Sequence, residues 1–143
     1  MTDIRTREDI HHLMKKFYEK AIPDPQIGYF FTDIAKLDLE AHLPVITNFW
    51  EMVVFGTRTY NNNVMTIHQH LHRLAPINEI HFARWLTLFS ETVDELFAGN
   101  HAELIKQRAL SIATIMKIKL LHSSPTSSNH DNTGSTATGR QLD

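Results

Sequence analysis

The sequence contains no cysteine. The chain therefore has no disulfide framework, no thiolate nucleophile and no zinc or iron–sulfur site built on cysteine. Such a chain is compatible with a reducing compartment, and we expect a cytoplasmic protein.

Long apolar runs are missing too, because none approaches the roughly 20 residues that span a bilayer. The charged start MTDIRTRED lacks the apolar segment of a secretory signal, so we expect no membrane partner.

Glycine is scarce, with five residues in a chain of 143. No two of them are close enough to form a GxGxxG motif or a P-loop. This excludes the glycine-rich cradles that hold nucleotide phosphates. The five are Gly28, Gly56, Gly99, Gly134 and Gly139.

The chain also lacks an excess of positive charge. Its 14 Lys and Arg residues are balanced by 16 Asp and Glu residues, which gives a formal net charge of −2. Binding to a phosphate backbone relies on clustered positive charge. We therefore expect no nucleic-acid partner.

Length and composition together predict one folded domain with a polar tail. The chain has the usual length of a single domain, and its 42% apolar residues are enough for a core. From residue 123 the sequence reads SSPTSSNHDNTGSTATGRQLD, with one apolar side chain larger than alanine. Such a segment cannot repay the entropy of ordering. We expect a globular domain over residues 1–122 and a disordered tail over residues 123–143.

Apolar residues recur at helical spacing in the first part of the chain. A capping box, Thr6 with Asp9, precedes a first helix that must stop before Pro23. The apolar stretch Ile27–Phe31 is too short for a full helix and predicts a turn or a single helical coil.

The second long helix contains Pro44, which has no backbone N–H to donate to residue 40. We therefore expect the regular helix to begin near Ala41 or His42. Gly56 is expected to end it, because glycine favours the left-handed conformation of a helix C-terminus.

The rest of the folded part predicts three further helices. A short helix can form over Val64–Leu71, and Asn78 is a plausible N-cap for a strongly amphipathic helix that ends before Gly99. A final helix is expected from about His101 to Leu121. The only pattern that could suggest a strand is the ambiguous Met52–Phe55. We therefore predict an all-α domain with four substantial helices.

Histidine is abundant, with ten residues. His68 and His72 are four apart and share one helix face, with His70 between them in the sequence. This spacing fits a zinc or nickel chelate that uses all three, or a single axial ligand to haem iron. A cofactor-free helical interaction domain, in which the histidines are incidental, is a further alternative. Hydrolysis has little support, because neither a Ser-His-Asp order nor paired carboxylates stand out.

The order of aromatic residues and histidines resembles the group III truncated haemoglobins over nearly all of residues 7–121. The other truncated-globin groups carry Gly-Gly signals after the second globin helix, whereas this chain has only Gly28 there. The residues that carry the resemblance are Phe17-Tyr18, Phe30-Phe31, His42-Leu43-Pro44, Phe49-Trp50-Glu51, Tyr60-Asn61, His68, His81-Phe82, Arg84-Trp85-Leu86, Leu88-Phe89 and Glu91-Thr92-Val93-Asp94.

The resemblance implies a two-over-two helical sandwich around one haem b, with His68 as its proximal iron ligand. His68 follows Tyr60 by the eight residues that are usual in the family. The usual Gly-x-Pro between them is replaced by residues 62–64, Asn-Asn-Val, and the step from His68 to Trp85 is longer than in many members. His72 is therefore a second candidate for the proximal ligand.

The same resemblance places four residues on the opposite side of the haem. Tyr18 occupies the distal tyrosine position and Trp85 the distal tryptophan position, so both would donate hydrogen bonds to a bound ligand. Phe31 would pack on the haem face. His42 would occupy the distal position of the second long helix. Because Pro44 fixes His42 in the first turn, we expect its ring at the ligand entrance rather than on the iron.

A haem with these neighbours implies a globin that binds dioxygen, nitric oxide and other diatomic ligands at ferrous iron. Two hydrogen-bond donors at roughly 1 kcal/mol each would slow oxygen release by about tenfold or more. Retention of this kind favours redox chemistry over delivery. Nitric-oxide dioxygenase and peroxidase-like activity are both chemically available to a haem with polar distal donors, and each would need an electron donor.

Overall fold

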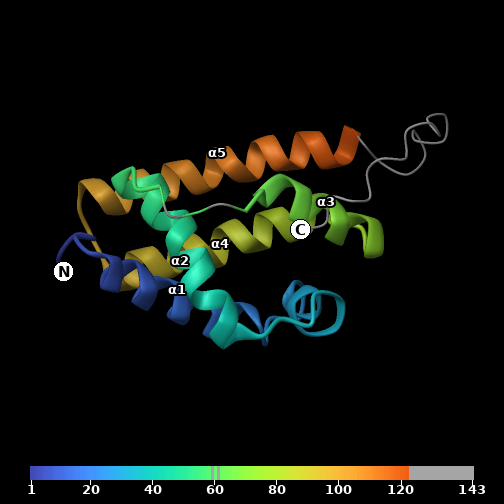
Figure 1. Cartoon of the computed structure of the whole chain (residues 1–143), viewed down its shortest axis with the longest axis horizontal. Coiled ribbons are helices and arrows are strands. Elements are labelled where there is room, and N and C mark those ends of the chain that lie inside the picture. The colour runs from blue at the N-terminus through green and yellow to red at the C-terminus, as the bar shows by residue number, and fades with distance from the viewer. Residues whose placement is uncertain (59, 61, 123–143) are drawn as a thin grey trace.

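The computed structural model describes residues 1–58, 60 and 62–122. All regular elements in this part of the chain are helical, the ambiguous segment Met52–Phe55 included, which confirms the all-α prediction. The predicted tail lies outside the described residues. The elements are α1 (Arg7–Ala21), the π-helix η1 (Phe30–Ile34), α2 (Leu39–Phe55), α3 (Val64–Leu74), α4 (Glu79–Leu96) and α5 (Asn100–His122), as Figure 1 shows.

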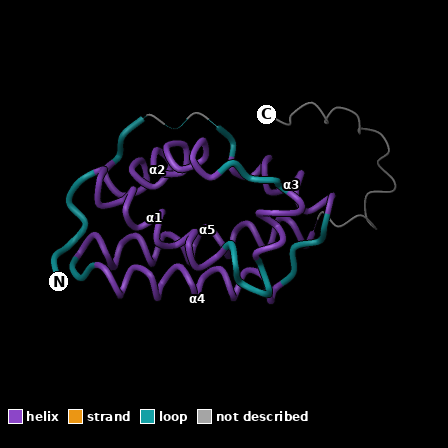
Figure 2. Tube along the Cα trace, turned by 90° about the horizontal axis from the view of Figure 1, so that it is seen from below, coloured by secondary structure: helices purple, strands orange, loops and turns teal. Residues whose placement is uncertain are grey.

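Four long helices form two packed pairs. α1 packs against α2, and α4 packs against α5; the two pairs meet through contacts of α1 with α4 and of α2 with α5. The short helix α3 lies at one end, where it contacts η1 and α5 (Figure 2). This arrangement is the two-over-two sandwich that the family resemblance implies. None of the described helices is long and apolar enough to cross a membrane.

The interior consists of two hydrophobic clusters. The larger one lies where α1, α2, α4 and the first half of α5 meet, and includes the almost fully buried rings of Phe17 and Phe89. The smaller one joins η1, α4 and α5 through Phe30, Phe82 and Met116. α3 packs against both clusters only with partly buried side chains. It is therefore held less tightly than the four long helices.

Helix α1 begins as the sequence predicts. Thr6 Oγ1 accepts a hydrogen bond from the Asp9 N–H at 3.2 Å, and the Asp9 carboxylate accepts from the Thr6 N–H at 3.1 Å. This capping box satisfies N–H groups that have no partner inside the helix. The helix ends at Ala21, two residues before Pro23.

Helix α2 begins earlier than expected. The prediction of a start near Ala41 or His42 was wrong, because the helix starts at Leu39 and contains Pro44. The Asp38 side chain caps it by accepting from the Ala41 N–H at 3.3 Å. Pro44 removes one hydrogen bond near the helix start, where the side chain of residue 40 is exposed and water can replace the bond. Gly56 ends α2 in the left-handed conformation, with φ of 76°, as predicted.

The short elements were predicted only in outline. Ile27–Phe31 was expected to be a turn or a single helical coil, and η1 is a single π-helical coil that starts at Phe30. α3 starts at Val64, as expected, but continues three residues beyond Leu71. Asn78 caps α4, and its N–H donates to His81 Nδ1 at 2.8 Å.

The N-terminal segment folds onto the start of α5. The Asp3 carboxylate accepts hydrogen bonds from the N–H groups of His101 and Ala102, both at 2.9 Å. Gly99 precedes the helix with φ of 146°, and a Cβ at this position would fall in the space of the Asp3 side chain. Glycine is therefore required here for both its conformation and its size.

Candidate functional site

Tyr18 and His42 lie against each other on the facing sides of α1 and α2. Tyr18 Oη and His42 Nε2 are 2.9 Å apart, a hydrogen-bond distance. Tyr18 lies on the buried face of α1, as the apolar spacing around it predicts, and its side chain is only 6% exposed. Phe31 of η1 packs edge-on against the Tyr18 ring, with ring centroids 5.5 Å apart. Three residues that are distant in the sequence thus form one wall.

The buried surroundings keep Tyr18 and His42 uncharged near neutral pH. Burial raises the pKa of Tyr18 well above its usual range. Burial, with a smaller effect of His68, lowers the pKa of His42. A neutral phenol and a neutral imidazole can each donate one hydrogen bond and accept another. Either side chain can therefore donate the hydrogen bond that joins them, and the other side chain then keeps a proton for a further acceptor.

His68 lies on α3, and one of its ring nitrogens forms a hydrogen bond. Its Nδ1 is 2.9 Å from the carbonyl oxygen of Val64, one turn earlier. A carbonyl only accepts, so Nδ1 carries the proton and Nε2 keeps a free lone pair. Burial lowers the pKa of His68, although the hydrogen bond to Val64 opposes this shift. A neutral imidazole with a free Nε2 is what a metal ligand requires.

His68 and His42 belong to the same region of the molecule. They lie close enough for charge on His68 to lower the pKa of His42. The structure thus brings a possible metal ligand from α3 towards the polar pair of α1 and α2.

Trp85 lies on α4 in an aromatic stack. Its ring is stacked on Phe89 at 5.0 Å between centroids and on Trp50 at 6.5 Å, and it meets the edge of Phe17 at 5.8 Å. Trp50 is 3% exposed, as expected for a core residue. Trp85 is only partly buried, and its indole N–H has no protein partner within the described part of the chain. That donor is available to a bound group.

Asp24 forms an ion pair with Arg84, the neighbour of Trp85 on α4, a contact that the sequence did not suggest. The buried Asp24 carboxylate accepts from Arg84 Nε at 2.8 Å and from the N–H groups of residues 26 and 27. The ion pair ties the segment before η1 to the turn of α4 that carries Trp85. The two residues are 60 positions apart, so helical spacing gave no signal for it.

His72 has a different environment from that of His68. Its side chain is buried, with 7% exposure, and its Nδ1 accepts the N–H of Ile77 at 3.0 Å. This bond fixes the connection between α3 and α4. Nε2 is enclosed and has no partner among the described residues. As a metal ligand His72 would have to leave this position, whereas His68 would not.

A three-histidine chelate does not form. Over residues 1–58, 60 and 62–122 no three His, Asp or Glu side chains gather as metal ligands. His68, His70 and His72 are all in this range, and the helix separates them. This geometry gives no support to the zinc or nickel alternative.

Comparisons with known proteins agree with this architecture. No family model matches the chain. It is 33% identical over 111 residues to the group 3 truncated hemoglobin Ctb of Campylobacter jejuni, a match that covers 76% of this chain and 85% of the relative. A crystal structure of a group III truncated hemoglobin from Campylobacter jejuni matches with a TM-score of 0.74 and 31% identity, over 84% of this chain and 95% of that one.

Proposed function

The chain belongs to the group III truncated haemoglobins, and from this premise we propose that it binds one haem b between α3 and the wall formed by α1, α2 and α4. His68 would be the proximal ligand, and dioxygen, nitric oxide or another diatomic molecule would bind on the opposite face. Ferrous haem, when bound, supplies reversible binding of such gases and one-electron chemistry.

The observation that carries this proposal is the state of His68. The Val64 carbonyl holds the proton on Nδ1, and burial keeps the ring neutral, so Nε2 is ready to act as a donor to iron. A hydrogen bond to the far nitrogen also orients a metal-ligating imidazole and raises its basicity. The residues present therefore fit a haem.

The opposite wall fits a small polar ligand. Tyr18 and Trp85 offer an O–H and an N–H donor, and His42 can relay a hydrogen bond through Tyr18. Buried donors of this kind stabilise a ligand that carries partial negative charge, because few waters compete for them. Phe31 and Phe17 keep the wall apolar around the donors.

Such a site favours retention of its ligand. We propose that the protein acts in redox chemistry, as a nitric-oxide dioxygenase or with peroxidase-like turnover, rather than in oxygen delivery. Either reaction needs an electron donor to return the iron to its starting state. The chain itself has no cysteine that could supply electrons.

Replacing each candidate histidine with glycine tests the proposal. The His68→Gly protein should bind haem weakly, and should regain a five-coordinate ferrous spectrum only when imidazole fills the vacated place. The measurement is the visible spectrum of the ferric, ferrous and ferrous-CO forms.

His72→Gly is the matched control, one helical turn away. It should keep the wild-type spectrum, although loss of its bond to Ile77 should lower the melting temperature. The opposite pattern would move the ligand to His72. Absence of a Soret band in the wild-type protein after haem addition would reject the haem proposal altogether.

A further inference from the structure

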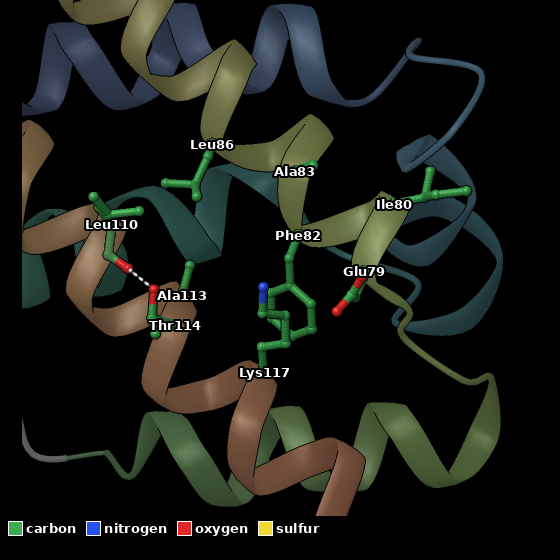
Figure 3. Close-up of a pocket in the computed structure, with 9 residues that line it drawn as sticks. All are labelled: Glu79, Ile80, Phe82, Ala83, Leu86, Leu110, Ala113, Thr114 and Lys117. Carbon is green, nitrogen blue, oxygen red and sulfur yellow. Dashed lines mark hydrogen bonds between the residues drawn. The ribbon is translucent and has the colours of Figure 1, made fainter.

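A groove runs between α4 and α5 on the outside of the molecule, away from the candidate site. It has a volume of about 360 Å³, and Figure 3 shows the side chains that line it. Phe82 and Leu86 of α4 face Ala113 of α5 across it. Ile80 and Leu110 stand at its edges with 61% and 56% of their surface exposed.

The second half of α5 exposes large apolar side chains to solvent, among the exposed polar residues Ser111, Thr114 and Lys119. Ile115 and Ile118 are 53% and 50% exposed, and Lys117 is the one charged residue between positions 110 and 118. The first half of the helix, by contrast, turns Glu103 and Arg108 to solvent. Large apolar side chains gathered on one exposed surface mark a contact site. Leu110 lines the groove and is exposed, so the groove is the part of this surface that a partner would cover.

The groove also carries two opposite charges that have no ion-pair partner in the described part of the chain. Glu79 lies on the α4 wall and Lys117 on the α5 wall, near the same end. A twofold axis along the groove would bring Glu79 of one copy to Lys117 of the other, and the reverse. Such reciprocity is the rule for a contact between identical surfaces.

We propose that the cover is a second copy of this chain, docked groove to groove through α4 and α5. The same twofold axis would set Leu110 of each copy against the apolar α4 wall of the other, with two reciprocal Glu79 to Lys117 pairs at the end of the groove. The segment 123–143 is the other occupant within reach, but its polar composition does not match an apolar groove. The apolar lining and the opposite charges on the two walls make the groove complementary to a second copy of itself.

Sedimentation equilibrium of the haem-loaded full chain tests this proposal. The wild-type protein should reach twice its 16.5 kDa mass as concentration rises. Glu79→Lys would place like charges together and should weaken dimerisation by about tenfold or more. Combining it with Lys117→Glu restores both pairs in reverse, and should restore the dimer.

Two leucine variants complete the test. Leu110→Glu should give a monomer, whereas Leu74→Glu should leave the dimer intact, since Leu74 has the same 56% exposure but does not line the groove. Unchanged visible and circular dichroism spectra would show that each variant is folded. A wild-type monomer at every concentration, a double charge reversal that stays monomeric, or equal effects of the two leucine variants would each overturn the proposal.

Discussion

The hydrogen bond between Tyr18 and His42 has two possible directions, and they have different consequences. If Tyr18 donates to His42, its proton is not available to a ligand. If His42 holds the proton on Nε2 and donates, the phenol is free to point its own proton into the site. In the proposed haem site, the tautomer of His42 would therefore decide how strongly Tyr18 can hold a ligand, even though His42 need not touch that ligand.

At the residue scale we expect Tyr18→Phe and Trp85→Phe each to speed oxygen release. Tyr18→Phe removes one donor and nothing else of size, whereas Trp85→Phe removes a donor together with one ring of the stacked indole. A donor worth about 1 kcal/mol corresponds to about fivefold in the dissociation rate. Stopped-flow measurement of oxygen release from the ferrous protein gives these rates directly.

Tyr29→Phe is the control for these two variants, because Tyr29 is exposed and packs on Phe30 rather than in the site. Its rate should equal that of the wild type. Unchanged rates in both site variants would remove the donor role of Tyr18 and Trp85.

At the element scale, the start of α5 depends on a residue at the other end of the chain. Asp3 supplies the cap that the sequence around Asn100 does not, and so it joins the N-terminal segment to α5. Burial alone would raise the pKa of Asp3, but hydrogen bonds from His101, Ala102 and Ile4 outweigh this effect and lower it. The charged form is therefore the one that the fold stabilises.

We expect Asp3→Ala to lower the free energy of unfolding by about 1 kcal/mol at neutral pH, as for the loss of other helix caps. Because the folded pKa lies below the unfolded value of about 3.9, this contribution is complete above that value. It is lost as pH falls through the folded pKa. The difference between variant and wild type should thus shrink in acid, as measured by urea unfolding at several pH values.

Asp33→Asn, which changes an exposed carboxylate of η1, should show no such pH-dependent difference from the wild type. If the free energies of unfolding of Asp3→Ala and the wild type differed by the same amount across the acid range, the charge of Asp3 would not contribute to the cap.

Element ends were predictable where the signal was local. Thr6, Asp9 and Gly56 act within one helical turn, and the sequence placed them correctly. The start of α2 was misplaced because the rule for Pro44 considers only its missing donor. The cap from Asp38 and the access of water to the exposed turn compensate for that loss. The Asp3 cap spans 98 residues, and no local pattern indicates it.

On the scale of the whole molecule, helical spacing predicted which faces are buried but not which side chains meet. It placed Tyr18 inward on α1, yet the contact with His42 depends on how α1 crosses α2. Helical spacing also put His68 and His72 on one face, but it could not tell which of them is the better candidate for an iron ligand. That distinction comes from the Val64 carbonyl and the Ile77 N–H. The assignment of the site residues therefore came from family resemblance, with spacing as support.

The domain boundary leads to a prediction for the whole chain. Removing residues 123–143 should leave haem affinity and melting temperature nearly unchanged, because the composition of that segment offers little apolar surface to bury. Thermal unfolding and haem titration of the shortened protein check this. A large loss of stability would mean that the segment docks on the domain.

The aromatic stack around Phe89 offers a direct optical readout of the proposed haem binding. The chain has two tryptophans, Trp50 and Trp85, and both belong to the stack around Phe89. A haem bound as proposed would lie near that stack and would absorb light at the wavelengths where indoles emit. Filling of the site should therefore extinguish nearly all the intrinsic fluorescence together, and emission during a titration would count occupied molecules without any label.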